Sequence, residues 1–88
     1  MENCITNSFL GMKITANYSD INDPHLDIDY NREHCEFSLR DMAPVKGNLP
    51  DRALSFVVEW VEQNINDIED NHLRVMYGRP LKQIRPLV

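Results

Sequence analysis

The amino-acid sequence predicts an α+β fold, in which a small antiparallel meander of three or four strands is packed by one long or two consecutive C-terminal helices. Two observations carry this prediction. Between residues 9 and 47, apolar and polar residues alternate, which is the period of a half-buried strand. From about residue 50 to residue 77, apolar residues recur every three or four positions, which is the period of an amphipathic helix. The chain has 88 residues, so we expect residues 9–88 to form a single domain.

The first predicted strand lies within residues 9–18. Polar or small residues alternate there with four apolar ones, which are Leu10, Met12, Ile14 and Ala16. The preceding residues 1–8 are mostly polar and show no periodicity, so we expect a flexible N-terminus. Residues 19–24 are rich in Asn, Asp and Pro, which favour a loop.

A β-hairpin is predicted next, with a two-residue turn at Asn31 and Arg32. Its register places apolar pairs on one face and charged pairs on the other, and a slip of one residue would expose Phe37. The predicted pairs are Asp29 with His34, Ile28 with Cys35, Asp27 with Glu36, and Leu26 with Phe37. Residues 41–48 then form a short fourth strand or a loop.

The helical part is expected over residues 50–77. Pro50 and Asp51 suit the first turn of a helix. The predicted apolar stripe consists of Leu54, Val57, Val58, Val61, Ile65 and Ile68. Polar residues at 64–67 leave open whether the segment is one helix or two. Gly78 and Pro80 end the helical pattern, and we expect residues 79–88 to pack back as an extended tail.

Composition limits the classes of partner. Nine basic and fourteen acidic residues give a formal net charge of −5 at pH 7, which opposes binding to nucleic acid and to anionic membranes. No stretch approaches the roughly 18 consecutive apolar residues of a membrane span. The two cysteines do not resemble a disulfide framework, and no secretory signal precedes them. We therefore expect a cytoplasmic protein.

The polar face of the predicted hairpin carries a group of histidines and carboxylates. Its members are His25, Asp27, Asp29, His34 and Glu36. Such side chains at alternate strand positions can converge on a divalent metal ion. Polar residues also alternate outward for solubility alone, and the spacing matches no dedicated metal motif. We therefore favour a solvated acidic face and predict no metal and no other cofactor. A catalytic pair of Cys35 and His34 would need another register, since Cys35 faces the core in this one.

Two further features are candidates for partner contacts. Trp60 lies about a right angle away from the main apolar stripe, so it either anchors the edge of the core or belongs to an interface. The C-terminal region is basic and carries Arg74, Arg79, Lys82 and Arg85. These cations either cap the helix and aid solubility or bind an acidic surface. With Asp27, Asp29 and Glu36, they complete the set of candidate partner-binding residues.

The order of these segments resembles a family of short bacterial proteins catalogued as domain of unknown function 4160. The resemblance covers most of the chain, and its most specific parts are the helix start at residues 49–54 and the ending at residues 78–87. Those segments read LPDRAL and GRPLKQIRPL. The other matching segments are FLGMKI at residues 9–14, NDPHLD at residues 22–27 and VEWV at residues 58–61.

One departure from the family pattern concerns a histidine pair. The family usually has a second histidine two residues after the first, whereas this chain has Asp27 after His25. A two-histidine site is therefore not carried over intact, although Asp27 can offer an oxygen ligand instead. Members resemble small proteins encoded in pairs, which implies a component of a toxin–antitoxin-like module.

Two function classes follow from the sequence. The first is a small non-enzymatic protein-interaction module or inhibitor that binds a protein partner, with a homodimer as a further alternative. The second is a toxin-like nuclease or hydrolase, in which His25 and Asp27 are catalytic candidates and the basic C-terminal residues stabilise phosphate charge. The net negative charge favours the first class.

Overall fold

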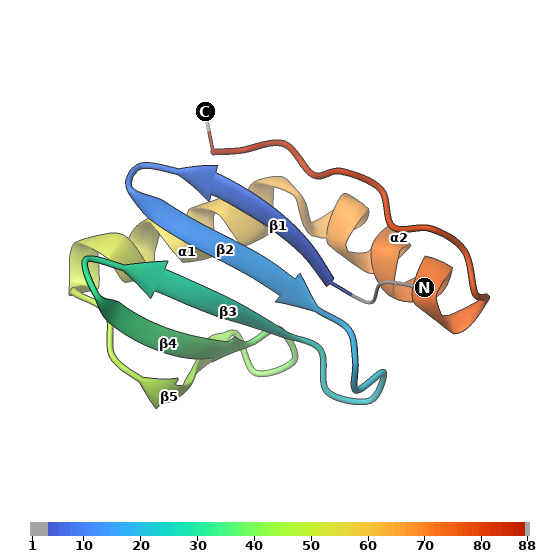
Figure 1. Ribbon diagram of the computed structural model, residues 1–88, viewed down its shortest axis with the longest axis horizontal. Helices are drawn as coiled ribbons and strands as arrows, with labels where there is room; N and C mark the ends of the chain where they lie inside the picture. Colours follow the sequence, from blue (N-terminus) through green and yellow to red (C-terminus); the bar gives the residue numbers. More distant parts are fainter. Residues whose placement is uncertain (1–3, 88) are drawn as a thin grey trace.

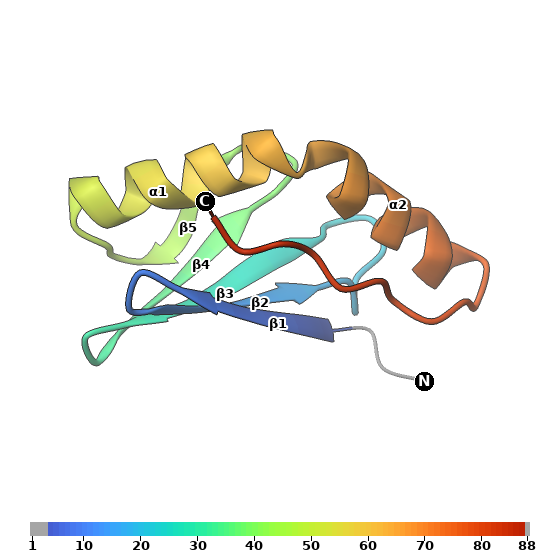
Figure 2. The ribbon, with the colours of Figure 1, turned by 90° about the horizontal axis from the view of Figure 1, so that it is seen from above.

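The computed structural model describes residues 4–87, which form two layers (Figures 1 and 2). One layer is an antiparallel sheet with the strand order β1-β2-β3-β4-β5, and two helices lie along one of its faces. The predicted α+β class is confirmed, but the sheet has five strands instead of three or four. The elements are β1 (Cys4–Phe9), β2 (Met12–Asn17), β3 (His25–Tyr30), β4 (Glu33–Ser38), β5 (Ala43–Gly47), α1 (Asp51–Gln63) and α2 (Ile65–Met76).

Strand β1 corrects the prediction of a flexible segment over residues 1–8. Residues 4–8 belong to this strand, which pairs with β2, and residues 1–3 lie outside the described part of the chain. The alternation is hidden in the sequence because Asn7 lies opposite the buried Ile14 and so shares its face. The Asn7 amide donates a hydrogen bond to the Ile84 carbonyl at 2.5 Å, which satisfies a polar group at an inward position.

The β3–β4 hairpin has the predicted register. Asp27 lies opposite Glu36 and Ile28 lies opposite Cys35, while Asn31 and Arg32 form the turn with positive φ angles of 48° and 67°. Cys35 is fully buried, as the register requires. Residues 43–47, for which a strand and a loop were both open, form the edge strand β5. The apolar residues Leu26, Ile28, Cys35 and Phe37 therefore face the helices. The charged and polar residues at the alternate positions, which are Asp27, Asp29, His34 and Glu36, face away from them.

The core lies between the sheet and the helices. Its buried apolar residues come from the inner face of the sheet, from both helices and from the C-terminal tail. They are Met12, Ile14, Ala16, Tyr18, Leu26, Ile28, Cys35, Phe37, Ala53, Val57, Trp60, Val61, Ile68 and Ile84. Because Ile84 is among them, the predicted packing of the tail against the domain is confirmed, and Figure 1 shows the tail running beside β1.

The helical segment consists of two helices that meet at Asn64. This residue has a non-helical φ of −119°, and its side-chain amide donates to the Trp60 carbonyl at 2.9 Å. The buried face is rotated from the predicted stripe: Trp60 is 1% exposed, whereas Ile65 is 40% exposed. Within residues 4–87, neither helix is both long and apolar enough to cross a membrane.

Gly47 ends β5 in a conformation that only glycine tolerates here. Its φ is +77°, and a Cβ at this position would overlap the backbone carbonyl oxygen of His34. Gly78 also has a positive φ, of +67°, but a Cβ there would meet no atom within 4 Å. A substitution at Gly78 therefore introduces only backbone strain, whereas a substitution at Gly47 introduces the same strain together with a steric overlap.

We expect Gly47→Ala to destabilise the protein clearly more than Gly78→Ala. The left-handed conformation alone costs a non-glycine residue about 1–3 kcal/mol, and at Gly47 displacement of the β4 backbone adds to that cost. Urea denaturation followed by far-UV circular dichroism measures both variants. Equal losses of stability in the two variants would show that β5 is not held against β4 as described.

Candidate functional site

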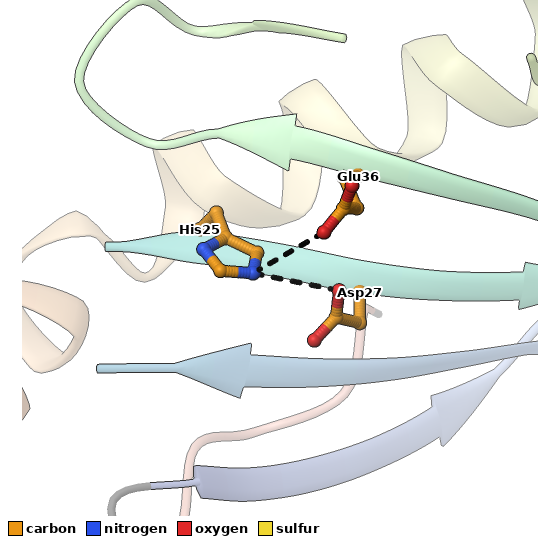
Figure 3. A group of neighbouring side chains, drawn as sticks. All are labelled: His25, Asp27 and Glu36. Carbon is orange, nitrogen blue, oxygen red and sulfur yellow. Dashed lines mark ion pairs between the residues drawn. The ribbon is translucent and has the colours of Figure 1, made fainter. Parts of the chain in front are cut away.

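The candidate site lies on the face of the sheet opposite the helices, which we call the outer face. His25 and Asp27 occupy alternate positions of β3, and Glu36 lies directly across from Asp27 on β4. Residues two apart on a strand, and residues paired across two strands, share one face, so the three side chains point the same way. Figure 3 shows the imidazole of His25 facing both carboxylates. The sequence predicted this shared face, and the structure confirms it.

The three side chains approach one another closely. The Nε2 atom of His25 lies 3.5 Å from Asp27 Oδ1 and 3.7 Å from Glu36 Oε1. One donor atom from each residue lies within 4.8 Å of the other two. The side chains are 26%, 27% and 30% exposed, so they are partly withdrawn from water. This group can accept hydrogen bonds, hold a cation or pair with a basic side chain.

Asp29 and His34 extend the group along the hairpin. His34 Nδ1 and Asp29 Oδ1 are 2.8 Å apart, and this hydrogen bond raises the pKa of His34 above its usual value. His34 Nε2 lies 3.9 Å from Asp27 Oδ1. We refer to these two residues and the preceding three together as the outer-face cluster, which consists of His25, Asp27, Asp29, His34 and Glu36.

Asn17 supports the cluster from the neighbouring strand β2. Its amide donates a hydrogen bond to Asp27 Oδ2 at 3.3 Å, so the other carboxylate oxygen is left facing His25. The sequence does not single out Asn17 as part of this group. The only signal was its outward position at the end of a predicted strand, and the register of that strand against β3 depends on the loop between them.

Cys35 is not part of the cluster, although it lies between two of its members in the sequence. Its side chain is buried on the opposite face, and burial raises the pKa of the thiol, which keeps it protonated at neutral pH. The sequence-based rejection of a Cys35–His34 pair agrees with this geometry.

Trp60 is a core residue and not part of an exposed interface. Its indole Nε1–H donates to the Arg85 carbonyl at 2.7 Å, and its ring centroid lies 5.7 Å from that of Phe9. Of the two roles left open by the sequence, the structure selects the anchor of the core. Trp60 is therefore removed from the candidate partner-binding residues, because only 1% of it is exposed.

The candidate basic residues of the C-terminal region lie on α2 and the tail and not on the outer face with the cluster. Arg74 pairs with Asp70 at 2.8 Å, which holds the pKa of that carboxyl below its usual value, and Lys82 pairs with Asp67 at 3.0 Å. Both pairs belong to α2 and the tail. Arg79 and Arg85 are exposed in the same C-terminal region. A basic surface is thus partly neutralised by acidic residues of α2.

Comparison with known proteins gives one match. No curated protein and no solved structure matches the chain. The model of the family described as domain of unknown function (DUF4160) matches residues 11–72. This range contains β2 to β5, all of α1 and the whole outer-face cluster. Because the match covers well over half of the sequence, the chain belongs to the DUF4160 family.

Proposed function

We propose that the protein is a small non-enzymatic binding module that docks a protein partner on the outer face of its sheet. One observation carries the proposal: the helices cover one face of the sheet (Figure 2), and the other face presents the carboxylates of Asp27 and Glu36 (Figure 3) together with that of Asp29. A protein surface with a basic centre complements these charges. The net charge of −5 supports the same kind of partner through long-range attraction.

The lysines of the outer face refine this complementarity. Lys13 of β2 lies opposite Asp29, and Lys46 of β5 lies opposite Glu36. The acidic centre on β3 and β4 is therefore bordered by one lysine on each side. A partner with basic residues at its centre and acidic or neutral residues around them fits this pattern, and a second copy of the same face does not.

The alternative function, a toxin-like nuclease or hydrolase, has less support. It combines His25 and Asp27 with cations that stabilise phosphate charge. Arg74 and Lys82 instead pair with Asp70 and Asp67 in the helical region. We further propose a cytoplasmic protein of a toxin–antitoxin-like pair, consistent with its free cysteines and with the resemblance noted above.

The test is affinity capture from native lysate at low and high salt, with mass spectrometry of the eluate. The key variant carries Asp27→Asn, Asp29→Asn and Glu36→Gln. A control variant carries Glu59→Gln, Glu62→Gln and Glu69→Gln, which removes the same number of charges from exposed positions of the helices. Performing the capture in EDTA restricts the test to charge complementarity.

We expect the wild type and the helix variant to retain one stoichiometric protein partner at low salt and to lose it at high salt. The sheet variant is expected to bind that partner at least about tenfold more weakly, which corresponds to about 1.4 kcal/mol. A partner that stays bound to the sheet variant, or that is lost from both variants equally, would refute docking on the outer face.

A further inference from the structure

We propose that His25, Asp27 and Glu36 form a binding site for one divalent transition-metal ion, with Zn²⁺ as the best fit (Figure 3). This site goes beyond the docking function proposed above and does not depend on it. The proposal rests on the distances between the donor atoms, the way in which the sheet fixes their positions, and the chemistry of the donor set.

The distances are close to those around a bound ion. Donor atoms placed tetrahedrally at about 2.0–2.1 Å from Zn²⁺ are about 3.3–3.4 Å from one another. His25 Nε2 lies 3.5 Å from Asp27 Oδ1 and 3.7 Å from Glu36 Oε1. Shifts of a few tenths of an ångström therefore bring both distances from the imidazole to those of a bound ion. The donor oxygens of Asp27 and Glu36 lie within 4.8 Å of each other, and rotation of these two side chains brings them into the same coordination shell.

The backbone holds the three side chains in place before any ion binds. His25 and Asp27 are two residues apart on β3, and Asp27 faces Glu36 in the hydrogen-bonded ladder between β3 and β4. This hairpin lies inside the sheet, between β2 and β5. Because the backbone is already ordered, binding has to fix only side-chain rotamers.

A neighbouring side chain orients one of the ligands. Asn17 donates to Asp27 Oδ2, so that Oδ1 is the oxygen presented to His25. Groups that hydrogen-bond to a ligand in this way commonly raise the affinity of metal sites. Asn17 comes from β2, so three adjacent strands contribute to the site.

The donor set distinguishes between ions. One imidazole nitrogen and two carboxylate oxygens suit Zn²⁺, Co²⁺ or Ni²⁺, whereas Mg²⁺ and Ca²⁺ prefer six or more oxygen ligands. The two carboxylates neutralise the charge of the ion. His34 is outside the ligand set that we assign, because its Nδ1 bonds Asp29 and its Nε2 is 3.9 Å from Asp27 Oδ1.

The experiment is isothermal titration of purified, untagged, chelator-treated protein with ZnCl₂. We expect one ion per chain for the wild type and little competition from excess Mg²⁺. His25→Gln and Asp27→Asn each remove a ligand, so we expect the Kd to rise at least about 10- to 100-fold, the effect typical of losing an outer-shell partner. Glu33→Gln changes an exposed carboxylate of the same hairpin and serves as the control, with unchanged affinity.

Thermal unfolding provides a second measurement on the same proteins. A ligand that binds only the folded state raises its Tm, so Zn²⁺ is expected to raise the Tm of the wild type and of Glu33→Gln but not that of His25→Gln. Unfolding without metal verifies that each variant is folded. Both assays use the isolated protein, so their failure is distinguishable from a failure of partner docking, which is tested in EDTA.

Three results would overturn the assignment. The first is the absence of stoichiometric Zn²⁺ binding by the wild type. The second is an equal loss of affinity in Glu33→Gln and His25→Gln, which would indicate general attraction to a negative surface. The third is binding that survives His25→Gln and is lost in His34→Gln, which would place the ion between His34 and Asp29.

Discussion

Replacing Trp60 with alanine is expected to destabilise the protein by about 3–5 kcal/mol, because truncation of a fully packed tryptophan removes a large apolar surface and leaves a cavity. Trp60 is 1% exposed, packs against Phe9 and donates its indole N–H to the Arg85 carbonyl. A small domain has a total stability of about 5–15 kcal/mol. This one substitution therefore removes a large part of the margin that keeps the protein folded.

Urea denaturation followed by far-UV circular dichroism measures this loss, since Trp60 is the single tryptophan and fluorescence is lost with it. Trp60→Phe serves as the matched variant. It retains most of the apolar contact but not the donor to Arg85, so we expect an intermediate cost. A cost below about 1 kcal/mol for Trp60→Ala would contradict its place in the core and would return it to the candidate interface residues.

The second large effect is expected at Asn71, where Asn71→Ala should cost about 2–4 kcal/mol. Asn71 is fully buried, and its amide makes two hydrogen bonds to one residue of the tail. Its Nδ2 donates to the Lys82 carbonyl at 2.9 Å, and its Oδ1 accepts from the Lys82 N–H at 2.8 Å. Each backbone group that loses its partner without regaining water costs about 1–3 kcal/mol.

Hydrogen exchange locates the effect in the chain. In Asn71→Ala we expect faster exchange at the Lys82 amide and earlier proteolysis of residues 79–87 than in the wild type. Asn66→Ala, at an exposed position of the same helix, is the control and should change neither. Unchanged exchange at Lys82 in Asn71→Ala would mean that the tail is held by other contacts.

The hairpin was predictable because several local signals agree. Alternation in both strands, a turn of suitable residues and the cost of exposing Phe37 all select the observed register. The same reasoning placed the outer-face cluster on one surface. The distances within it could not be predicted, because they depend on rotamers, on sheet twist and on the Asn17 contact from β2.

The buried face of the helices was harder to predict, because apolar residues lie on two adjacent faces of the helical segment and either face could pack against the sheet. The observed buried face includes Asn64 and Asn71. A polar side chain predicts an exposed position, and burial of these two is explained only by their hydrogen bonds, which the sequence does not show. Trp60 lies on that face, and Ile65 lies on the other. Asn7 in β1 misleads in the same way. In these three asparagines, the partner is a backbone carbonyl of the adjoining turn or of the distant tail.

One of the two ion pairs that neutralise the basic C-terminal region could be predicted from the sequence. Asp70 and Arg74 are four residues apart on a helix, which is a favourable distance for an ion pair. The ion pair between Lys82 and Asp67 could not be predicted from the sequence, because it depends on how the tail packs along α2. The C-terminal region that is basic in the sequence is therefore partly neutralised in the folded protein.

The contacts between the tail and β1 also determine when the domain can complete its folding during synthesis. Asn7 donates to the Ile84 carbonyl and Gln83 donates to the Thr6 carbonyl, so residues 77 positions apart must meet. While a ribosome still holds residues 82–85, Asn7, Trp60 and Asn71 lack their partners. We therefore expect the nascent hairpins and helices to form first and the domain to consolidate only after release of that segment, with loop closure over most of the chain as the last and slowest step.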